Sequence, residues 1–345
     1  MRFFLTAIWI VLAPPVWADV AQESAQLAAL PEVPGAVAGW ISVEDSEFAV
    51  AGVRVAGATD EIGEDDAWHI GSLTKSMTAT LAARLVEDNQ ITWTATIGEV
   101  LGQQYPDMDP AWQDVTLAML LRHASGMDAN LGRWRSLWLG DGPRANYLEA
   151  MLADEPVGDQ GAFAYSNAGY VVAGAMLEAA AGAPWEELMQ TQIFAPLGIE
   201  SAGFGPPQGG VPEGHSVNRR GVPSAAGQGR AADNIPAMGP AGRVHLSASD
   251  MLLYLRAHLI RDEDFLSAES WRRLQTPEGE GLYAFGWVSD GNRMQHSGSN
   301  TLWYATAYID REAGRAGFVA VNSGDREAVE DPIAEAVQRL VGTVD

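Results

Sequence analysis

Residues 69–86 read HIGSLTKSMTATLAARLV, and this stretch decides the kind of fold to expect. Its long apolar side chains recur every four residues with alanines between them, at Leu73, Met77, Leu81 and Leu85. That spacing predicts a helix whose apolar stripe enters a core. Ser72 then lies in the first turn, and Lys75 shares its face, so the amine can reach the hydroxyl. Backbone N–H groups at the helix N-terminus would favour an oxyanion there and lower the pKa of the amine.

Lys75 is the one lysine among 21 basic residues, the other 20 being arginine. An arginine stays protonated, whereas a desolvated amine can lose its proton near neutral pH and act as a base. The exception therefore suggests a position where a guanidinium would not serve. A chance placement of one lysine in an arginine-rich chain is the alternative that this count leaves open, because S-x-x-K alone is a common tetrapeptide.

Strand-like segments lie toward both ends of the chain, and helical ones lie in the middle. β-rich runs predict a strand pair at 37–43 and 48–55, and further strands at 283–289, 293–296, 302–309 and 317–321. Apolar periodicity predicts helices at 114–122, 146–152, 168–181, 184–193, 247–258 and 331–340. Residues 202–235 are rich in Gly and Pro, which predicts a long loop that borders a site or is mobile.

This order predicts an α+β fold, in which an antiparallel sheet built from both termini is flanked by helices and a mainly helical domain is inserted. The expected units are an α/β domain formed by residues 19–90 together with 240–345, and a mainly helical domain over residues 91–239. The junction between them is the place to expect a ligand site.

The N-terminus has the pattern of a Sec-type signal peptide over residues 1–18. A basic residue, an apolar run from Phe3 to Leu12 and a small-residue ending at Ala18 predict cleavage after Ala18. The apolar run is too short to cross about 30 Å of hydrocarbon, so no stable membrane insertion is expected. The expected location is periplasmic or secreted.

Composition narrows the partners and the chemistry. The net charge of −24 makes nucleic acid an unsuitable partner and favours a soluble surface, as in a salt-adapted protein. The absence of cysteine excludes disulfides, cysteine nucleophiles and cysteine metal ligands. No spacing of His, Asp and Glu resembles a metal site, so neither metal nor cofactor is expected. The expected partner is a small-molecule or peptide substrate, and the oligomeric state stays open, with a monomer plausible.

Two further motifs could complete a nucleophilic site, although each is weak alone. Residues 165–167 read YSN just before a predicted helix, and a tyrosine there could move a proton beside an amide that binds a carbonyl. Residues 296–298 read HSG at the end of a β-run. Gly298 would let a substrate backbone approach, and His296 could carry a proton or meet an anion.

The order of the three motifs resembles that of the serine β-lactamase and penicillin-binding superfamily. The similarity is to the branch of class C β-lactamases, D-Ala-D-Ala carboxypeptidases and related esterases. It extends to whole blocks, which run in order through about residues 30–340: HIGSLTK at 69–75, LLRHASGM at 120–127, YSNAGY at 165–170, PAGRV at 240–244 and SASD at 247–250.

The resemblance implies roles for three catalytic residues. Ser72 would be the nucleophile that forms an acyl-enzyme, and Lys75 would be the base that accepts its proton. Tyr165 would pass a proton to the leaving group and later help to activate water. These roles imply a serine hydrolase that acts on an ester or an amide, be it a β-lactam, a D-alanyl peptide or a carboxylic ester.

The resemblance also implies a set of binding groups. Asn167 would bind the acyl side chain of the substrate, and His296 would lie opposite Tyr165. The backbone N–H groups of Ser72 and Ser299 would form the oxyanion hole, with Gly298 beside them.

His296 departs from the pattern, because β-lactamases of this branch usually carry lysine there. Some carboxypeptidases and esterases resemble this chain at the position. An imidazole with an ordinary pKa of about 6.5 would lose its charge between roughly pH 6 and pH 8, so binding of anionic substrates should weaken over that range. Esterase activity with weak β-lactam turnover is therefore expected.

Two other interpretations compete with the hydrolase. A catalytically silent protein could keep the pocket in order to bind a cell-wall fragment or a β-lactam, although it would then be free to lose Ser72, Lys75 or Tyr165. A Ser-His-Asp hydrolase would carry a G-x-S-x-G elbow, which the sequence lacks. The other histidines are expected to be ordinary: His123 and His245 bonded locally in loops, His215 and His258 at the surface or satisfied.

Overall fold

The computed structural model describes residues 18–130, 144–279 and 281–342. The predicted signal peptide therefore lies, apart from Ala18, outside the described residues. Within the described ranges, no helix combines the length and the apolar character needed to cross a membrane.

The α-helices are α1 (Val20–Ala28), α2 (Thr74–Glu87), α3 (Ile97–Leu101), α4 (Leu117–Leu121), α6 (Arg144–Leu152), α7 (Asn167–Ala181), α8 (Trp185–Met189), α9 (Gly239–Gly242), α10 (Ala248–Ile260), α11 (Ala268–Gln275) and α12 (Arg326–Val341). Shorter turns of 3-10 helix are η1 (Gly71–Leu73), η2 (Pro110–Trp112), η4 (Arg230–Ala232) and η5 (Pro236–Met238), and η3 (Gln190–Phe194) is a π-helix.

The strands are β1 (Gly35–Ser42), β2 (Ser46–Gly52), β3 (Ala67–His69), β4 (Gly203–Phe204), β5 (His215–Val217), β6 (Pro223–Ala225), β7 (Val244–Ser247), β8 (Val288–Ser289), β9 (Arg293–Ser299), β10 (Tyr304–Asp310) and β11 (Arg315–Val321). Six of them form one antiparallel sheet in the order β2-β1-β11-β10-β9-β8. The sheet joins both ends of the chain, which confirms the predicted α+β architecture.

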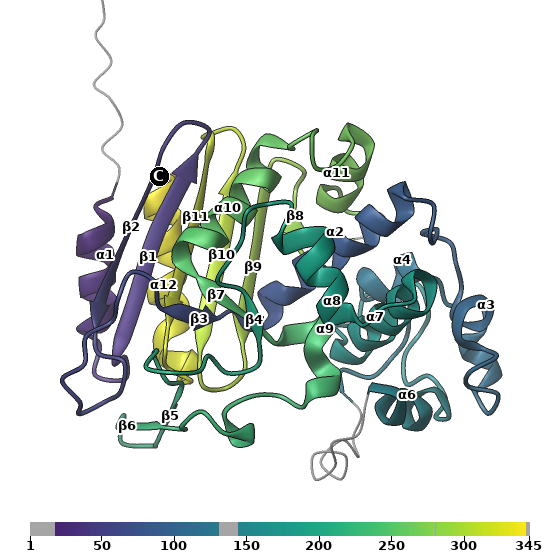
Figure 1. The fold of residues 1–345 in the computed structure, drawn as a ribbon, viewed down its shortest axis with the longest axis horizontal. Helices are drawn as coiled ribbons and strands as arrows, with labels where there is room; N and C mark the ends of the chain where they lie inside the picture. Colours follow the sequence, from purple (N-terminus) through teal and green to yellow (C-terminus); the bar gives the residue numbers. More distant parts are fainter. Residues whose placement is uncertain (1–17, 131–143, 280, 343–345) are drawn as a thin grey trace, which may run out of the picture.

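Both faces of the sheet are covered by helices, as Figure 1 shows. Helices α1 and α12 lie on one face, where Trp40, Tyr304 and Val319 pack with Val337. Helix α10 lies on the other, where the apolar side chains join a larger core that continues into the helical region. The alternation along each strand supplies both faces, because successive side chains point to opposite sides of a sheet.

Helix α2 connects the sheet to the helical region. Eleven of its fourteen residues are buried, because it is packed by α7, α9 and α11. Gly174 on α7 lets α9 approach closely, since a Cβ there would lie 2.3 Å from Cγ of Pro240. The start of α2 is therefore held where the sheet, α7 and α9 meet, and Figure 1 shows α2 between the sheet and the helices α3, α4, α6 and α7.

Three predicted segments differ from the structure. The strand expected at 283–289 is reduced to β8, because Gly286 turns the chain with φ of +82° against the backbone of Ser76, where a Cβ would lie 2.4 Å from Cα. Residues 202–235 contain the short strands β4, β5 and β6 in addition to loop. The helix expected from residue 114 begins at Leu117, because the Thr116 side chain caps it.

Candidate active site

Ser72 lies in η1, immediately before α2. Lys75 is in the first turn of α2, and its Nζ lies 3.0 Å from Oγ of Ser72. The predicted contact across one helical face is therefore present. Ser72 is only partly buried, whereas Lys75 is fully buried, so Ser72 is the more accessible residue of the pair.

The Lys75 amine has two further contacts, both with oxygen acceptors. Its Nζ donates to Oδ1 of Asn167 at 2.7 Å and to the carbonyl of Ala241 at 2.6 Å. Burial lowers the pKa of Lys75 well below its ordinary value. In its neutral form the amine has two N–H groups and one lone pair, and the two carbonyl oxygens can accept both hydrogens. In that form the lone pair would face the Ser72 hydroxyl, which is the arrangement a general base needs.

Tyr165 lies beside this pair, just before α7. The ring centroid is 5.0 Å from Nζ of Lys75 and 6.5 Å from the His296 ring. Burial raises the pKa of Tyr165 to about 12, against the opposing effect of a hydrogen bond with Ser72. The phenol is therefore protonated at neutral pH. It can donate or relay a proton, but it is not a deprotonated base in the resting protein.

Asn167 is the first residue of α7, which the Ser166 side chain caps by accepting from the N–H of Gly169. Besides the contact with Lys75, its Nδ2 donates to Oδ1 of Asn130 at 3.1 Å. The Asn167 amide is thereby oriented from both ends. Asn130 was not singled out by the sequence, since one asparagine in a loop carries no local signal.

The backbone nitrogens of Ser72 and Ser299 both lie where β9 meets η1. A Cβ on Gly71 would lie 2.3 Å from the nitrogen of Ser299, and a Cβ on Gly298 would lie 2.6 Å from the nitrogen of Ser72. Gly298 was expected to let a substrate backbone approach. Instead, the chain's own segment 70–72 occupies that side, because a Cβ on Gly298 would also lie 2.0 Å from the carbonyl oxygen of Ile70.

His296 lies on β9 and is mostly buried. Its Nδ1 lies 2.7 Å from the carbonyl of Ser297 and its Nε2 lies 3.2 Å from the Tyr283 hydroxyl, so Nδ1 carries the proton and Nε2 accepts. Burial, with a smaller effect from Lys75, lowers the pKa of His296 to about 4. The expectation of an ordinary pKa near 6.5 is therefore wrong, because this imidazole stays neutral across the physiological range.

The structure also brings in residues that were expected to be ordinary or were not noticed. The ring centroid of His123 lies 4.3 Å from that of Tyr165 and 4.6 Å from that of Tyr283, and its Nδ1 accepts from the N–H of Ser166. His123 therefore packs against the ring of Tyr165 and bonds to the residue after it, whereas it was expected to bond only within its own loop. Its place in the LLRHASGM block was the available signal. His215 and His258 are both fully buried.

Cavities border the site on the side of Tyr165 and His296. One of about 470 Å³ is lined by both residues and by side chains from β10 and α12. Another of about 760 Å³ shares Phe163, Tyr283 and Val288 with the first. The space beside Tyr165 is thus large enough for part of a small-molecule substrate.

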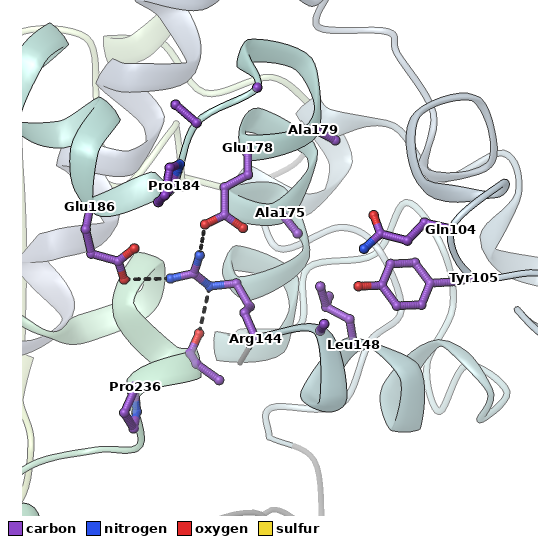
Figure 2. A pocket seen from close by; sticks show the side chains of 14 residues that line it. Gln104, Tyr105, Arg144, Leu148, Ala175, Glu178, Ala179, Pro184, Glu186 and Pro236 are labelled. Carbon is purple, nitrogen blue, oxygen red and sulfur yellow. Dashed lines mark hydrogen bonds and ion pairs between the residues drawn. The ribbon is translucent and has the colours of Figure 1, made fainter. Parts of the chain in front are cut away.

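A third cavity, of about 600 Å³, lies away from this chemistry among α6, α7 and α8 (Figure 2). Arg144 crosses it, contacting Glu178, Glu186 and the carbonyl of Ala237. None of the predicted site residues lines this cavity. Because the Arg144 guanidinium is already paired with two carboxylates, it offers little free positive charge to a ligand in this cavity.

Known proteins share both the sequence pattern and the fold. A family model described as Beta-lactamase matches residues 24–340. Penicillin-binding protein 4 of Amycolatopsis lactamdurans is 28% identical over 235 residues, covering 66% of this chain and 60% of that protein. Lovastatin esterase of Penicillium rubens is 28% identical over 161 residues, covering 41% and 40%. The matches thus span less than two thirds of these two relatives.

Solved structures extend the likeness to the whole fold. EstCE1, a hydrolase with promiscuous acyltransferase activity, superimposes with a TM-score of 0.77 at 17% identity, covering 93% of this chain and 96% of that one. The D-alanine carboxypeptidase AmpC from Burkholderia cenocepacia gives a TM-score of 0.74 at 17% identity, covering 92% and 96%. At such identities the agreement establishes the shared fold alone.

Proposed function

Because the chain belongs to the β-lactamase family, whose members are serine hydrolases, we propose that it hydrolyses esters or amides through an acyl-enzyme on Ser72. The observation that carries the proposal is the setting of Lys75. Its amine lies 3.0 Å from the Ser72 hydroxyl, is fully buried, and has two carbonyl acceptors for its hydrogens. A base of this kind is what a serine nucleophile requires.

The proposed reaction follows from these positions. Oγ of Ser72 attacks the substrate carbonyl while its proton moves to Nζ of Lys75, and the N–H groups of Ser72 and Ser299 stabilise the oxyanion. The C–O or C–N bond then breaks, and Tyr165 delivers a proton to the leaving group as it takes one from Lys75. Water attacks the acyl-enzyme through the same relay in reverse, which releases the acid and restores Ser72.

We further propose that neutral esters are better substrates than β-lactams or D-alanyl peptides, which carry a carboxylate. His296 is neutral at physiological pH because its pKa is about 4. Arg326, the cation that lines the adjoining cavity, has its Nε and Nη2 2.8 Å and 2.7 Å from the carboxylate of Glu330. Neither group therefore offers a free positive charge to a substrate carboxylate.

The proposed location is the periplasm or the outside of the cell, with a small-molecule or peptide substrate as the partner. The support is the Sec-type pattern of residues 1–18. Recovery of a mature protein that lacks residues 1–18 and begins at Asp19 would support export. A protein that keeps residues 1–18 in the cell envelope would contradict it.

The acyl-enzyme is tested by intact-protein mass after separate exposure to a fluorophosphonate, a penicillin and a nitrophenyl ester. A single adduct on Ser72, absent from Ser72→Ala, together with steady release of nitrophenol, is the expected result. A label on Ser125 or Ser297 with Ser72 unmodified would overturn the mechanism. A stable stoichiometric adduct without product release would instead support the silent binding protein.

A further inference from the structure

Asp233 lies in the Gly- and Pro-rich segment 202–235 but is 5% exposed. It follows η4 and packs beside the nucleophile segment. Burial raises the pKa of a carboxyl group, but here His69, Arg243 and Asn300 outweigh burial and lower the pKa of Asp233 to about 2. A buried carboxylate that stays ionised needs such partners, so this one is built into the fold.

Three side chains surround the Asp233 carboxylate. Oδ1 lies 3.0 Å from Nε2 of His69 and accepts from Nδ2 of Asn300 at 3.1 Å, and Oδ2 accepts from Nε of Arg243 at 3.0 Å. These side chains come from separate parts of the chain: His69 from β3, Asn300 from the position just after β9, and Arg243 from the position just after α9. One carboxylate therefore joins three segments that are far apart in sequence.

Each of these segments carries a backbone group of the proposed site. His69 precedes Ser72 by three residues, Asn300 follows Ser299 directly, and Arg243 lies two residues after Ala241. The nucleophile's N–H, the second oxyanion donor and the carbonyl that holds Lys75 are thus each within three residues of an Asp233 partner.

The link through His69 reaches the nucleophile turn itself. Nδ1 of His69 accepts from the N–H of Gly71 at 3.2 Å, so the ring proton is on Nε2, the nitrogen beside Asp233. Gly71 has φ of +50°, a conformation that places it against Ser299. The ring therefore spans from the carboxylate to the residue that directs Ser72 toward β9.

We infer that Asp233 is a positioning residue for the reaction: through His69, Arg243 and Asn300 it holds the N–H groups of Ser72 and Ser299 and the Ala241 carbonyl in register. The inference rests on the proposed acyl-enzyme mechanism. Asp233 itself contacts neither Ser72 nor Lys75 among its hydrogen-bond partners, so it acts through the backbone. Because oxyanion donors act only when correctly placed, its loss should affect the transition state more than substrate binding.

The first test compares Asp233→Asn with Asp310→Asn. Asp310 is 1% exposed and pairs with Arg293 at 3.0 Å, but it lies at the end of β10 away from Ser299. Both variants lose a buried carboxylate that is paired with an arginine, so both should lower Tm. In Asp233→Asn the amide N–H₂ must face a side chain of His69, Arg243 or Asn300 that also donates. The resulting donor–donor clash should displace the segment that carries that side chain. Each is assayed well below its own Tm.

We expect kcat for a nitrophenyl ester to fall about 10- to 100-fold in Asp233→Asn, with KM changed less than about 3-fold. Affinity for a boronic acid that forms a tetrahedral adduct on Ser72 should fall in parallel with kcat. Asp310→Asn should keep both within about 2-fold of the wild type. Equal losses in the two variants, or an unchanged kcat in Asp233→Asn, would overturn the inference.

His69 provides a second pair of variants if Asp233→Asn does not fold. Glutamine keeps one acceptor and one donor at this position, whereas leucine keeps neither, so His69→Gln should retain more kcat and more boronate affinity than His69→Leu. Indistinguishable kcat values in the two would count against the inference.

The Ser72→Ala variant separates the two proposals. Turnover by Ser72→Ala would refute the acyl-enzyme, whereas an inactive Ser72→Ala beside a fully active Asp233→Asn would refute only the positioning role.

Discussion

The amine of Lys75 donates to the carbonyl of Ala241 at 2.6 Å, across 166 residues of sequence. Together with the contact to Asn167, this bond holds the amine so that its remaining side faces Oγ of Ser72 at 3.0 Å. The base is therefore prepared by the surroundings of Lys75 as much as by its spacing from Ser72. Burial lowers the pKa of Lys75 well below its ordinary value, which favours the uncharged form that a base requires.

Replacing Lys75 with arginine should abolish most turnover while keeping the fold. A guanidinium stays protonated and cannot accept the Ser72 proton, so kcat should fall at least about 10³-fold, the scale of a lost general base. The measurement is the steady-state rate with a nitrophenyl ester, alongside circular dichroism. Arg256→Lys, at an exposed site that bonds the Val43 carbonyl, is the matched control and should stay fully active. Near-wild-type turnover in Lys75→Arg would assign the base to another group.

Binding of anionic substrates should not change between about pH 6 and pH 8. A histidine whose pKa is lowered is neutral above that pKa, and the value of about 4 for His296 puts its titration below this range. KM for an anionic cephalosporin and for a neutral ester should therefore both stay flat from pH 6 to pH 8. NMR titration of the His296 ring reports the pKa directly. A rise in KM for the anionic substrate alone, centred near pH 6.5, would show that His296 titrates like an ordinary histidine.

Adding one methyl group at Gly298 should disrupt the site. A Cβ there would lie 2.0 Å from the carbonyl oxygen of Ile70 and 2.6 Å from the nitrogen of Ser72, so backbone must move. We expect Gly298→Ala to lose about 100-fold or more in kcat and about 1–3 kcal/mol in the free energy of unfolding. Gly229→Ala is the control, because a Cβ at Gly229 meets nothing within 4 Å. Urea denaturation and ester hydrolysis measure the two effects, and wild-type values for Gly298→Ala would contradict the packing argument.

Local pattern was sufficient for much of the fold. The four-residue period after Ser72 predicted α2, and the β-rich runs at 37–43 and 48–55 predicted the pair β1 and β2. These predictions hold because period and side-chain burial are coupled within a single element. The run at 283–289 failed, since its residues favour a strand but Gly286 meets Ser76, a contact that belongs to the tertiary packing.

The sequence by itself determined the overall architecture, the spacing of Ser72 and Lys75, and the set of residues that could act with them. Only the tertiary structure decided the electrostatics, because desolvation depends on what covers a group. The pKa of His296 is about 4 and that of Asp233 is about 2, and in both cases groups distant in sequence help to set the value. The tertiary structure also decided two contacts, that of the Ala241 carbonyl with Lys75 and that of His69 with Asp233. Their partners come from distant segments, and only the packed chain brings them within hydrogen-bonding distance.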